Sequence, residues 1–191
     1  MRMPPASMRL ATVAAGLILA GVVTMSVASR VASGAEKDSV AARLQRLEDR
    51  ESIRNLITEY GRALDERDWR GFASLFAENG GEWIGGMGPA KGRAAIQKLM
   101  ETTIGTSTAS NGVTGTRGSN FHVFTNETVD VRGDTATALT KWTFVVASAD
   151  KRPQPLSSGH YVDTFVREQG GWKFQRRLAY GDIPQGEPKT N

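Results

Sequence analysis

The fold of this chain is decided by the stretch FHVFTNETVDVRGDTATAL, which occupies residues 121–139. Side chains that suit a core alternate here with polar ones at a period of two, and this alternation is typical of a half-buried β-strand. Residues 132–134, Arg-Gly-Asp, interrupt the alternation and predict a tight turn. The stretch therefore predicts one strand over 121–131 and a second, longer strand over 135–149.

Another hairpin follows farther along the chain. Residues 157–167 and 171–180 are each rich in strand-forming residues, with a Gln-Gly-Gly turn between them. Pro153 and Pro155 lack the backbone N–H that strand pairing uses, so 150–155 is expected to be a loop. The second half of the chain is therefore predicted to form an antiparallel sheet.

The first half of the chain has helical spacing instead. Apolar residues recur every three or four positions over 40–64, and the charged cluster at 48–51 predicts a bend or a break in that helix. Asp68 is suited to cap a short second helix over 69–76. Residues 92–100 form a third predicted helix.

Three shorter segments connect these elements. Residues 82–84 are predicted to form a short strand, 85–89 a glycine-rich loop, and 102–118 a surface loop rich in Gly, Thr and Ser. Helices followed by antiparallel strands define an α+β domain. We expect a cone-shaped, curved antiparallel sheet packed against three N-terminal helices and enclosing a pocket.

The N-terminal segment differs in composition from the rest. Its first nine residues contain two arginines and no acid, 10–28 is free of charge, and small residues follow, as in a secretory signal. The apolar run is nearly long enough to span a bilayer, so an uncleaved membrane anchor is the alternative. We expect a signal at 1–35, a domain at 36–184 that is secreted or periplasmic, and a polar tail at 185–191.

Charge and cysteine content exclude several classes of function. Residues 1–35 hold three arginines and no acid, so the remaining 21 basic and 20 acidic side chains give a net charge of +1. Without a basic run, a nucleic-acid partner is not expected. The absence of cysteine excludes disulfides, thiolate catalysis and cysteine-ligated zinc. About 155 residues suffice for one domain with a single core.

Few side chains of this chain are suited to proton transfer near neutral pH. Histidine is the residue whose ordinary pKa lies there, and the chain has two, His122 and His160. A carboxylate that accepts a hydrogen bond from one ring nitrogen orients the ring and makes the other nitrogen more basic. Asp65, at the end of the first predicted helix, is a candidate partner for His122. The alternatives are a half-buried strand histidine and a solvated helix-end aspartate.

A series of short motifs follows in a particular order along residues 39–180. They are RNLITEYGRALD at 54–65, Trp69 and then LFA at 75–77, Gly92-Arg93, His122-x-x-Thr125-Asn126, V-x-GD-x-A-x-A at 131–138, Tyr161-x-Asp163 and GWKF at 171–174. Together they resemble the SnoaL-like family of the nuclear transport factor 2-like superfamily. The resemblance implies an α+β cone with a deep apolar pocket.

The resemblance also implies a chemistry. In related enzymes such as scytalone dehydratase, bile-acid 7α-dehydratase and hexachlorocyclohexane dehydrochlorinase, a strand histidine paired with a helix aspartate removes a carbon-bound proton. The matching residues here are His122 and Asp65, and Tyr60 matches a pocket tyrosine that would polarise the substrate. This chemistry requires no metal and no cofactor. Tyr60 also lies on the apolar stripe of its helix, so a purely structural role is the alternative.

Further residues are expected to line the pocket. If residues 160, 162 and 164 share the strand face that points toward it, His160 and Val162 contact the substrate. An exposed strand-end histidine is the alternative for His160. The remaining candidates for substrate contact are Asn126 and the aromatic residues Trp83, Trp142 and Phe144, for which core packing is the alternative.

We therefore expect an exported small-molecule lyase or isomerase, dehydratase-like, that acts on a hydrophobic, ring-containing compound. Two alternatives come from other classes of function. One is a non-catalytic carrier of an apolar metabolite in the same pocket, and the other is an accessory domain that forms a homo-oligomer through the open face of its sheet. A His122 side chain in a cavity beside Asp65 favours the enzyme.

Overall fold

The computed structural model describes residues 39–105, 120–169 and 171–186. Contacts divide the chain into a unit of residues 1–39 and a unit of residues 40–191. The predicted signal or anchor, most of the predicted 102–118 loop and the end of the predicted tail lie outside the described residues. Among the helices that the structure does describe, none combines the length and apolar character needed to cross a membrane.

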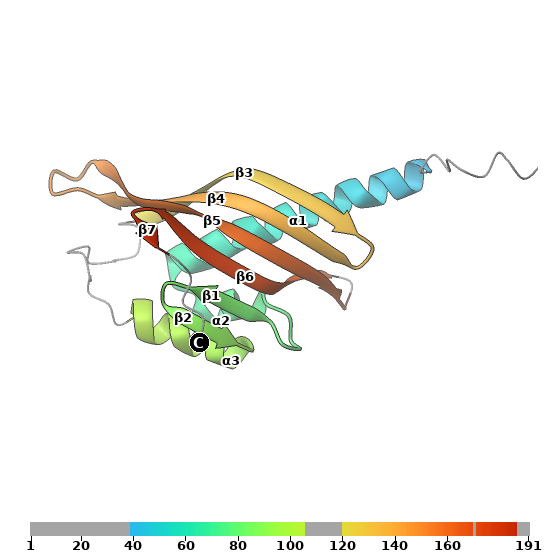
Figure 1. Cartoon of the computed structure of the whole chain (residues 1–191), viewed down its shortest axis with the longest axis horizontal. Helices are drawn as coiled ribbons and strands as arrows, with labels where there is room; N and C mark the ends of the chain where they lie inside the picture. Colours follow the sequence, from blue (N-terminus) through green and yellow to red (C-terminus); the bar gives the residue numbers. More distant parts are fainter. Residues whose placement is uncertain (1–38, 106–119, 170, 187–191) are drawn as a thin grey trace, which may run out of the picture. The chain divides into compact units, whose positions relative to one another are not determined.

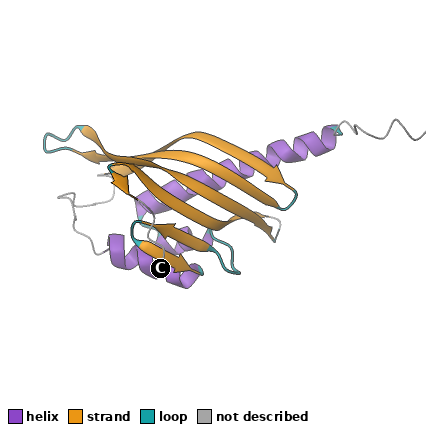
Figure 2. Ribbon diagram, in the orientation of Figure 1, coloured by secondary structure: helices purple, strands orange, loops and turns teal. Residues whose placement is uncertain are grey.

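The helices precede the four long strands in the described chain, as predicted, and Figure 2 shows helices in purple and strands in orange. They are α1 (Val40–Glu66), α2 (Trp69–Ser74), α3 (Arg93–Met100) and a π-helical turn η1 (Glu101–Gly105). The predicted cap of α2 is confirmed, because the Asp68 side chain accepts a hydrogen bond of 2.9 Å from the backbone N–H of Gly71. Of the bend or break predicted at 48–51, a break is wrong, since α1 is continuous for 27 residues.

The charged cluster in α1 contains an attachment to the sheet. Asp49 is only 5% exposed, and its Oδ1 accepts hydrogen bonds from Arg167 Nη2 at 2.7 Å and from Trp172 Nε1 at 3.2 Å. Burial alone would raise the pKa of Asp49, but hydrogen bonds from Arg167, Trp172 and Gln45 lower it below its ordinary value. A buried carboxylate with these partners holds α1 against the sheet, so the polar residues here do not end the helix.

We expect Asp49→Ala to lower the free energy of unfolding by about 1–3 kcal/mol at pH 7. The variant removes the hydrogen-bond acceptor of the Trp172 indole and one of the two carboxylates that bind Arg167. The pKa of Asp49 is lower in the folded protein than in the unfolded chain, where it is about 3.9. The carboxylate therefore stabilises the fold at pH values above about 3.9, and this stabilisation is lost as the pH falls through the pKa of the folded state. Urea unfolding at pH 7 and pH 3.5 should therefore show a smaller difference from wild type at the lower pH.

The matched control for this variant is Asp134→Ala. Asp134 is the other carboxylate that binds Arg167, at 3.0 Å, but its side chain is 81% exposed. Its loss should change the free energy of unfolding by less than about 0.5 kcal/mol. Equal losses for the two variants, or a loss at Asp49 that does not depend on pH, would contradict the attachment of α1 through Asp49.

In the described part of the chain, seven strands form one sheet in the order β2-β1-β6-β5-β4-β3, with β7 paired to β6. The strands are β1 (Glu82–Gly85), β2 (Gly88–Lys91), β3 (Asn120–Arg132), β4 (Thr135–Ala147), β5 (Pro153–Glu168), β6 (Gly171–Ile183) and β7 (Gln185–Gly186). Strands β3 to β6 are antiparallel neighbours, as predicted, whereas β1 is parallel to β6. Figure 1 shows α1 running along one face of the sheet.

Two predicted loops, 85–89 and 150–155, are shorter than predicted, because strands extend into them and leave only 86–87 and 150–152 outside the strands. Residues 85–89 belong to the hairpin of β1 and β2, in which Gly85 pairs with Gly88. Pro153 and Pro155 lie in β5 and pair with β4. At this end, β4 is the only neighbour of β5 among the described strands, because the pairing of β5 with β6 begins at Ser158. The missing proline N–H groups are therefore tolerated at what is locally a sheet edge.

Candidate active site

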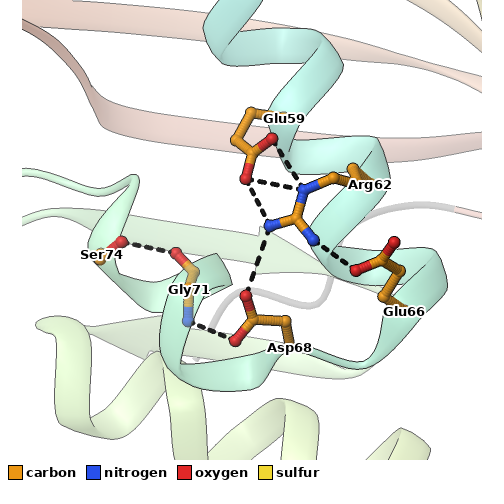
Figure 3. A network of polar contacts seen from close by, with 6 residues as sticks. All are labelled: Glu59, Arg62, Glu66, Asp68, Gly71 and Ser74. Atoms are coloured by element: carbon orange, nitrogen blue, oxygen red, sulfur yellow. Dashed lines mark hydrogen bonds and ion pairs between the residues drawn. The ribbon is translucent and has the colours of Figure 1, made fainter.

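The end of α1 is fixed by a group of charged side chains around Arg62 (Figure 3). Arg62 Nε donates a hydrogen bond of 2.8 Å to Glu59, and the guanidinium also binds Glu66 and, at 3.4 Å, Asp68. Asp68 caps the following helix, so Arg62 connects the last turn of α1 to the start of α2. These contacts are exposed, so they add little stability.

A glycine lets α1 approach β3 closely. A Cβ atom at Gly61 would lie 2.6 Å from Cε2 of Phe124, nearer than side-chain atoms normally come. Gly61 and Asp65 are one helical turn apart and share a face of α1, while Phe124 and His122 share a face of β3. The close contact of Gly61 with Phe124 therefore brings Asp65 near His122.

The predicted contact between His122 and Asp65 is confirmed. Nδ1 of His122 lies 2.7 Å from Oδ1 of Asp65, and the backbone N–H of His122 donates to Oδ2 at 3.0 Å. The two side chains are 16% and 22% exposed. One carboxylate thus binds both the ring and the main chain of the histidine. An ionised Asp65 accepts the Nδ1 hydrogen of a neutral imidazole and leaves the lone pair of Nε2 free.

Aromatic rings surround the imidazole of His122. Phe144 is the nearest, with ring centroids 4.7 Å apart, followed by Phe124 at 6.2 Å and Trp142 at 6.4 Å. Trp142 and Phe144, both predicted to line the pocket, therefore lie beside His122. Apolar neighbours reduce access of water and strengthen the electrostatic contact with Asp65.

Tyr60 and Trp83 lie deeper in the core. Tyr60 is 1% exposed, and its hydroxyl accepts a hydrogen bond of 3.0 Å from Trp83 Nε1. Burial raises the pKa of Tyr60, so the hydroxyl stays protonated and keeps one hydrogen to donate. Its ring packs on Phe72 and Phe124. The predicted polarising role of Tyr60 stays a prediction, while its structural role is evident.

The predicted orientation of residues 160, 162 and 164 is wrong. Tyr161, Asp163 and Phe165 are buried on one face of β5, so His160 and Val162 point to the opposite, outer face of the sheet. There His160 Nδ1 lies 2.8 Å from Asp182, and the imidazole stacks on Tyr180 with centroids 4.7 Å apart. Neither His160 nor Val162 can share a site with His122.

Asn126 has a backbone role in β3, and its predicted contact with the substrate stays a prediction. It is exposed and has a φ of 55°, at the irregularity where the pairing of β3 shifts between Thr125 and Thr128. Asparagine tolerates this left-handed conformation better than most residues. The bulge changes which residues of β3 face the core on either side of it.

A buried ion pair in the interior was not predicted. Arg177 donates to Asp163 through Nε at 2.8 Å and through Nη2 at 2.7 Å, and both side chains are fully buried. The guanidinium lies about 4 Å from the rings of Tyr60, Tyr161 and Phe174. Burial alone would lower the pKa of Arg177, but its contacts with Asp163 leave it above its ordinary value.

The signal that could have revealed the pair is positional, because Asp163 and Arg177 are opposite each other on the hairpin around 169–171. Among the described residues, no group of three or more metal-ligating side chains lies together. A groove of about 470 Å³ lies near the turns of the two long hairpins, lined in part by Asp130, Arg132 and Gln175. None of the predicted site residues lines it.

Comparison with known proteins identifies the class to which this fold and site belong. Residues 45–178 match the family model described as a SnoaL-like domain, and the chain belongs to this family. The resemblance inferred from the motifs and the predicted α+β fold are both confirmed. No match was found among curated proteins.

Several solved structures are similar to this chain. An NTF2-like protein with a cystatin-like fold from Novosphingobium aromaticivorans is 34% identical, over 74% of this chain and 88% of that one, with a TM-score of 0.61. A putative scytalone dehydratase from the same organism is 28% identical, over 73% and 87%, with a TM-score of 0.58. LinA is 21% identical, over 73% and 89%, with a TM-score of 0.58, and this likeness shows the fold alone.

Proposed function

We propose that this protein is a small-molecule lyase or isomerase that removes a carbon-bound proton from a hydrophobic, ring-containing compound. The observation that carries the proposal is the double contact of Asp65 with the ring and the backbone of His122. Membership of the SnoaL-like family and the likeness to a putative scytalone dehydratase support the same class of reaction.

The contacts of His122 suit a general base. With the Nδ1 hydrogen held by Asp65, the Nε2 lone pair takes the proton from carbon, and the carboxylate stabilises the imidazolium that forms. A positioned base of this kind contributes roughly 10²–10⁴-fold to a rate. In a lyase the leaving group then departs from the neighbouring carbon. In an isomerase the proton returns at another carbon.

The experiment begins with the ligand. The purified protein is incubated with a metabolite extract of its host, and the retained molecules are identified by mass spectrometry. They are then incubated with the protein in D₂O. We expect product, or deuterium at a carbon position, with the wild-type protein and at least about 100-fold less with His122→Gln, which keeps the size of the side chain and removes the base.

Two results of this experiment would oppose the proposal. If a molecule is retained unchanged and takes up no deuterium, the protein is a carrier. If His122→Gln exchanges at the wild-type rate, another residue is the base. Circular dichroism and thermal unfolding of His122→Gln are measured in parallel, so that a folding defect is not mistaken for loss of chemistry.

We also propose that residues 1–35 direct export of the domain. The support is their composition, with a basic start, an uncharged apolar run and small residues before Glu36. Amino-terminal sequencing of protein from the native host is expected to begin near Glu36. An intact Met1 in a membrane fraction would instead identify the segment as an anchor.

A further inference from the structure

The first turns of α1 carry three large apolar side chains that are exposed. Val40 is 81% exposed, Leu44 54% and Leu47 61%. Their spacing of four and then three residues places them in one row along the helix, here called the α1 stripe. Figure 1 shows these turns, at the blue end of α1, extending beyond the end of the sheet. Single exposed apolar residues are ordinary, but a continuous row of them marks a surface for interaction.

The α1 stripe points away from the rest of the domain. Asp49 marks the side of the helix that faces the sheet, because it is buried against Arg167 and Trp172. At about 100° per residue, the members of the stripe lie roughly 140–180° around the helix axis from Asp49. The apolar residues that enter the core begin at Ile53, one turn after Asp49 and on the same side. Because α1 is continuous, the stripe cannot reach the sheet, and any occupant comes from outside the described domain.

Basic side chains flank the stripe. Arg43 and Arg50 are exposed and, two turns apart, lie along the same flank of it. No acidic residue occurs from 40 to 47. Of the two acids that follow, Glu48 lies on the other flank and Asp49 is buried. A helix that is apolar on one face and basic beside it is typical of contact with a membrane surface.

The chain before α1 carries an apolar run close to the stripe in sequence. Residues 10–28 have no charge and are nearly long enough to span a bilayer. Residues 29–39 separate that run from Val40, and a segment of this length spans at most about 40 Å when extended. A run retained in the bilayer would therefore keep the stripe close to the lipid headgroups, and such a tether raises the effective concentration of a weak contact. Without the run, the same contact would be reversible.

A second copy of the helix fits the stripe less well than a lipid surface does. Helix pairing in a coiled coil needs an apolar row sustained over about three to four heptads. Here Glu51, which forms an ion pair with Arg54, occupies the next position of the row, so the row ends after about two turns. A stable protein interface buries about 1,200–2,000 Å², and three aliphatic side chains per copy supply only a fraction of that area. A lipid surface needs no matching row, and it supplies negative charge to the arginines.

We propose that residues 40–50 dock the domain on an anionic lipid bilayer. Val40, Leu44 and Leu47 enter the boundary between headgroups and acyl chains, where interfacial helices bury their apolar face. Arg43 and Arg50 bind the phosphates of the headgroups. The inference concerns where the protein works, and it does not depend on the proposed chemistry.

The test uses the full chain, reconstituted into vesicles of phosphatidylcholine with increasing amounts of phosphatidylglycerol. Because the sequence contains no cysteine, Leu44→Cys takes a single NBD label on the stripe. As phosphatidylglycerol is added, its emission is expected to shift to shorter wavelength and to be quenched by lipids that carry a nitroxide in the acyl chain. The matched control is Gln45→Cys, which is exposed about 100° farther around the same turn and should keep its label in water.

Paired arginine variants test the contribution of charge. Arg43→Gln/Arg50→Gln, with the label at position 44, should lower the equilibrium constant for docking by about 10–30-fold, so that more phosphatidylglycerol is needed for the same quenching. Arg70→Gln/Arg152→Gln removes the same charge from exposed positions in α2 and in the β4–β5 turn. Figure 1 shows that turn at the opposite end of the sheet from the start of α1, and this variant should dock like wild type. Circular dichroism of each variant checks that its helix content is unchanged.

The inference is overturned if the label at position 44 is not quenched in vesicles that contain phosphatidylglycerol. It is also overturned if the labels at 44 and 45 are quenched equally, or if the two arginine pairs have the same effect. An emission shift at position 44 that occurs without lipid and grows with protein concentration would overturn it as well, by identifying a second copy as the occupant.

Discussion

Replacing Arg177 with methionine is expected to lower the free energy of unfolding by about 3–5 kcal/mol, enough to unfold much of a domain of ordinary stability. The guanidinium is fully buried and makes two hydrogen bonds to Asp163. Without it, the carboxylate is left inside the core among the rings of Tyr60 and Tyr161, far from water. Methionine fills a similar volume, so the loss is mainly electrostatic.

The control for this variant removes both charges. The double variant Arg177→Met/Asp163→Leu leaves no unpaired ion in the core and should recover most of the lost stability, because a buried ion pair often contributes little compared with apolar packing. Chemical denaturation of the single and double variants measures the difference. A double variant that is as unstable as Arg177→Met, or a single variant that loses less than about 1 kcal/mol, would count against this account.

The largest effect on the proposed chemistry is expected from Asp65→Asn, which should lower the rate of proton abstraction by about 10³–10⁴-fold. The carboxylate accepts from both Nδ1 and the backbone N–H of His122. An amide has one oxygen, and its NH₂ group placed against Nδ1 stabilises the tautomer with hydrogen on Nε2. That tautomer cannot take a proton from carbon at Nε2.

The chain offers a matched control on the other face of the sheet. Asp182 binds Nδ1 of His160 at 2.8 Å, much as Asp65 binds His122, but it lies outside the proposed site. Asp182→Asn should change the rate of deuterium exchange less than about twofold. If the two asparagine variants are equally impaired, the effect is on the fold, and the dyad is not the source of the chemistry.

The order of helices and strands was predictable because it depends on local periodicity. The face of β5 that points inward was not, because both faces carry apolar residues, with Tyr161 and Phe165 on one and Val162 and Val166 on the other. The inward face also carries Asp163, and its partner Arg177 lies on another strand, where the local pattern of β5 does not reveal it. Strand β2 was missed for a similar reason, since a glycine- and proline-rich segment forms a strand only where a partner such as β1 is available.

The candidate site was predictable only in part. The contact of His122 with Asp65 followed from the chemistry of the two side chains and from the family motifs. The positions of Tyr60 and Trp83 in the core, and the unpaired N–H of Trp142, depend on how several strands pack together. Likewise, the sequence around Gly61 does not show that this glycine lets α1 approach β3, because the residue it makes room for, Phe124, lies on another element.

The backbone contact of Asp65 has a consequence for solubility. Strand β3 is the last strand in the sheet order, so one of its edges has no neighbouring strand in the described part of the chain. An open strand edge is a template on which another chain can add and aggregate. By accepting the outward N–H of His122, Asp65 blocks one position of that template. Mutation of Asp65 would therefore increase aggregation of the protein in addition to any loss of the proposed activity. Selection against aggregation alone would then favour keeping the carboxylate.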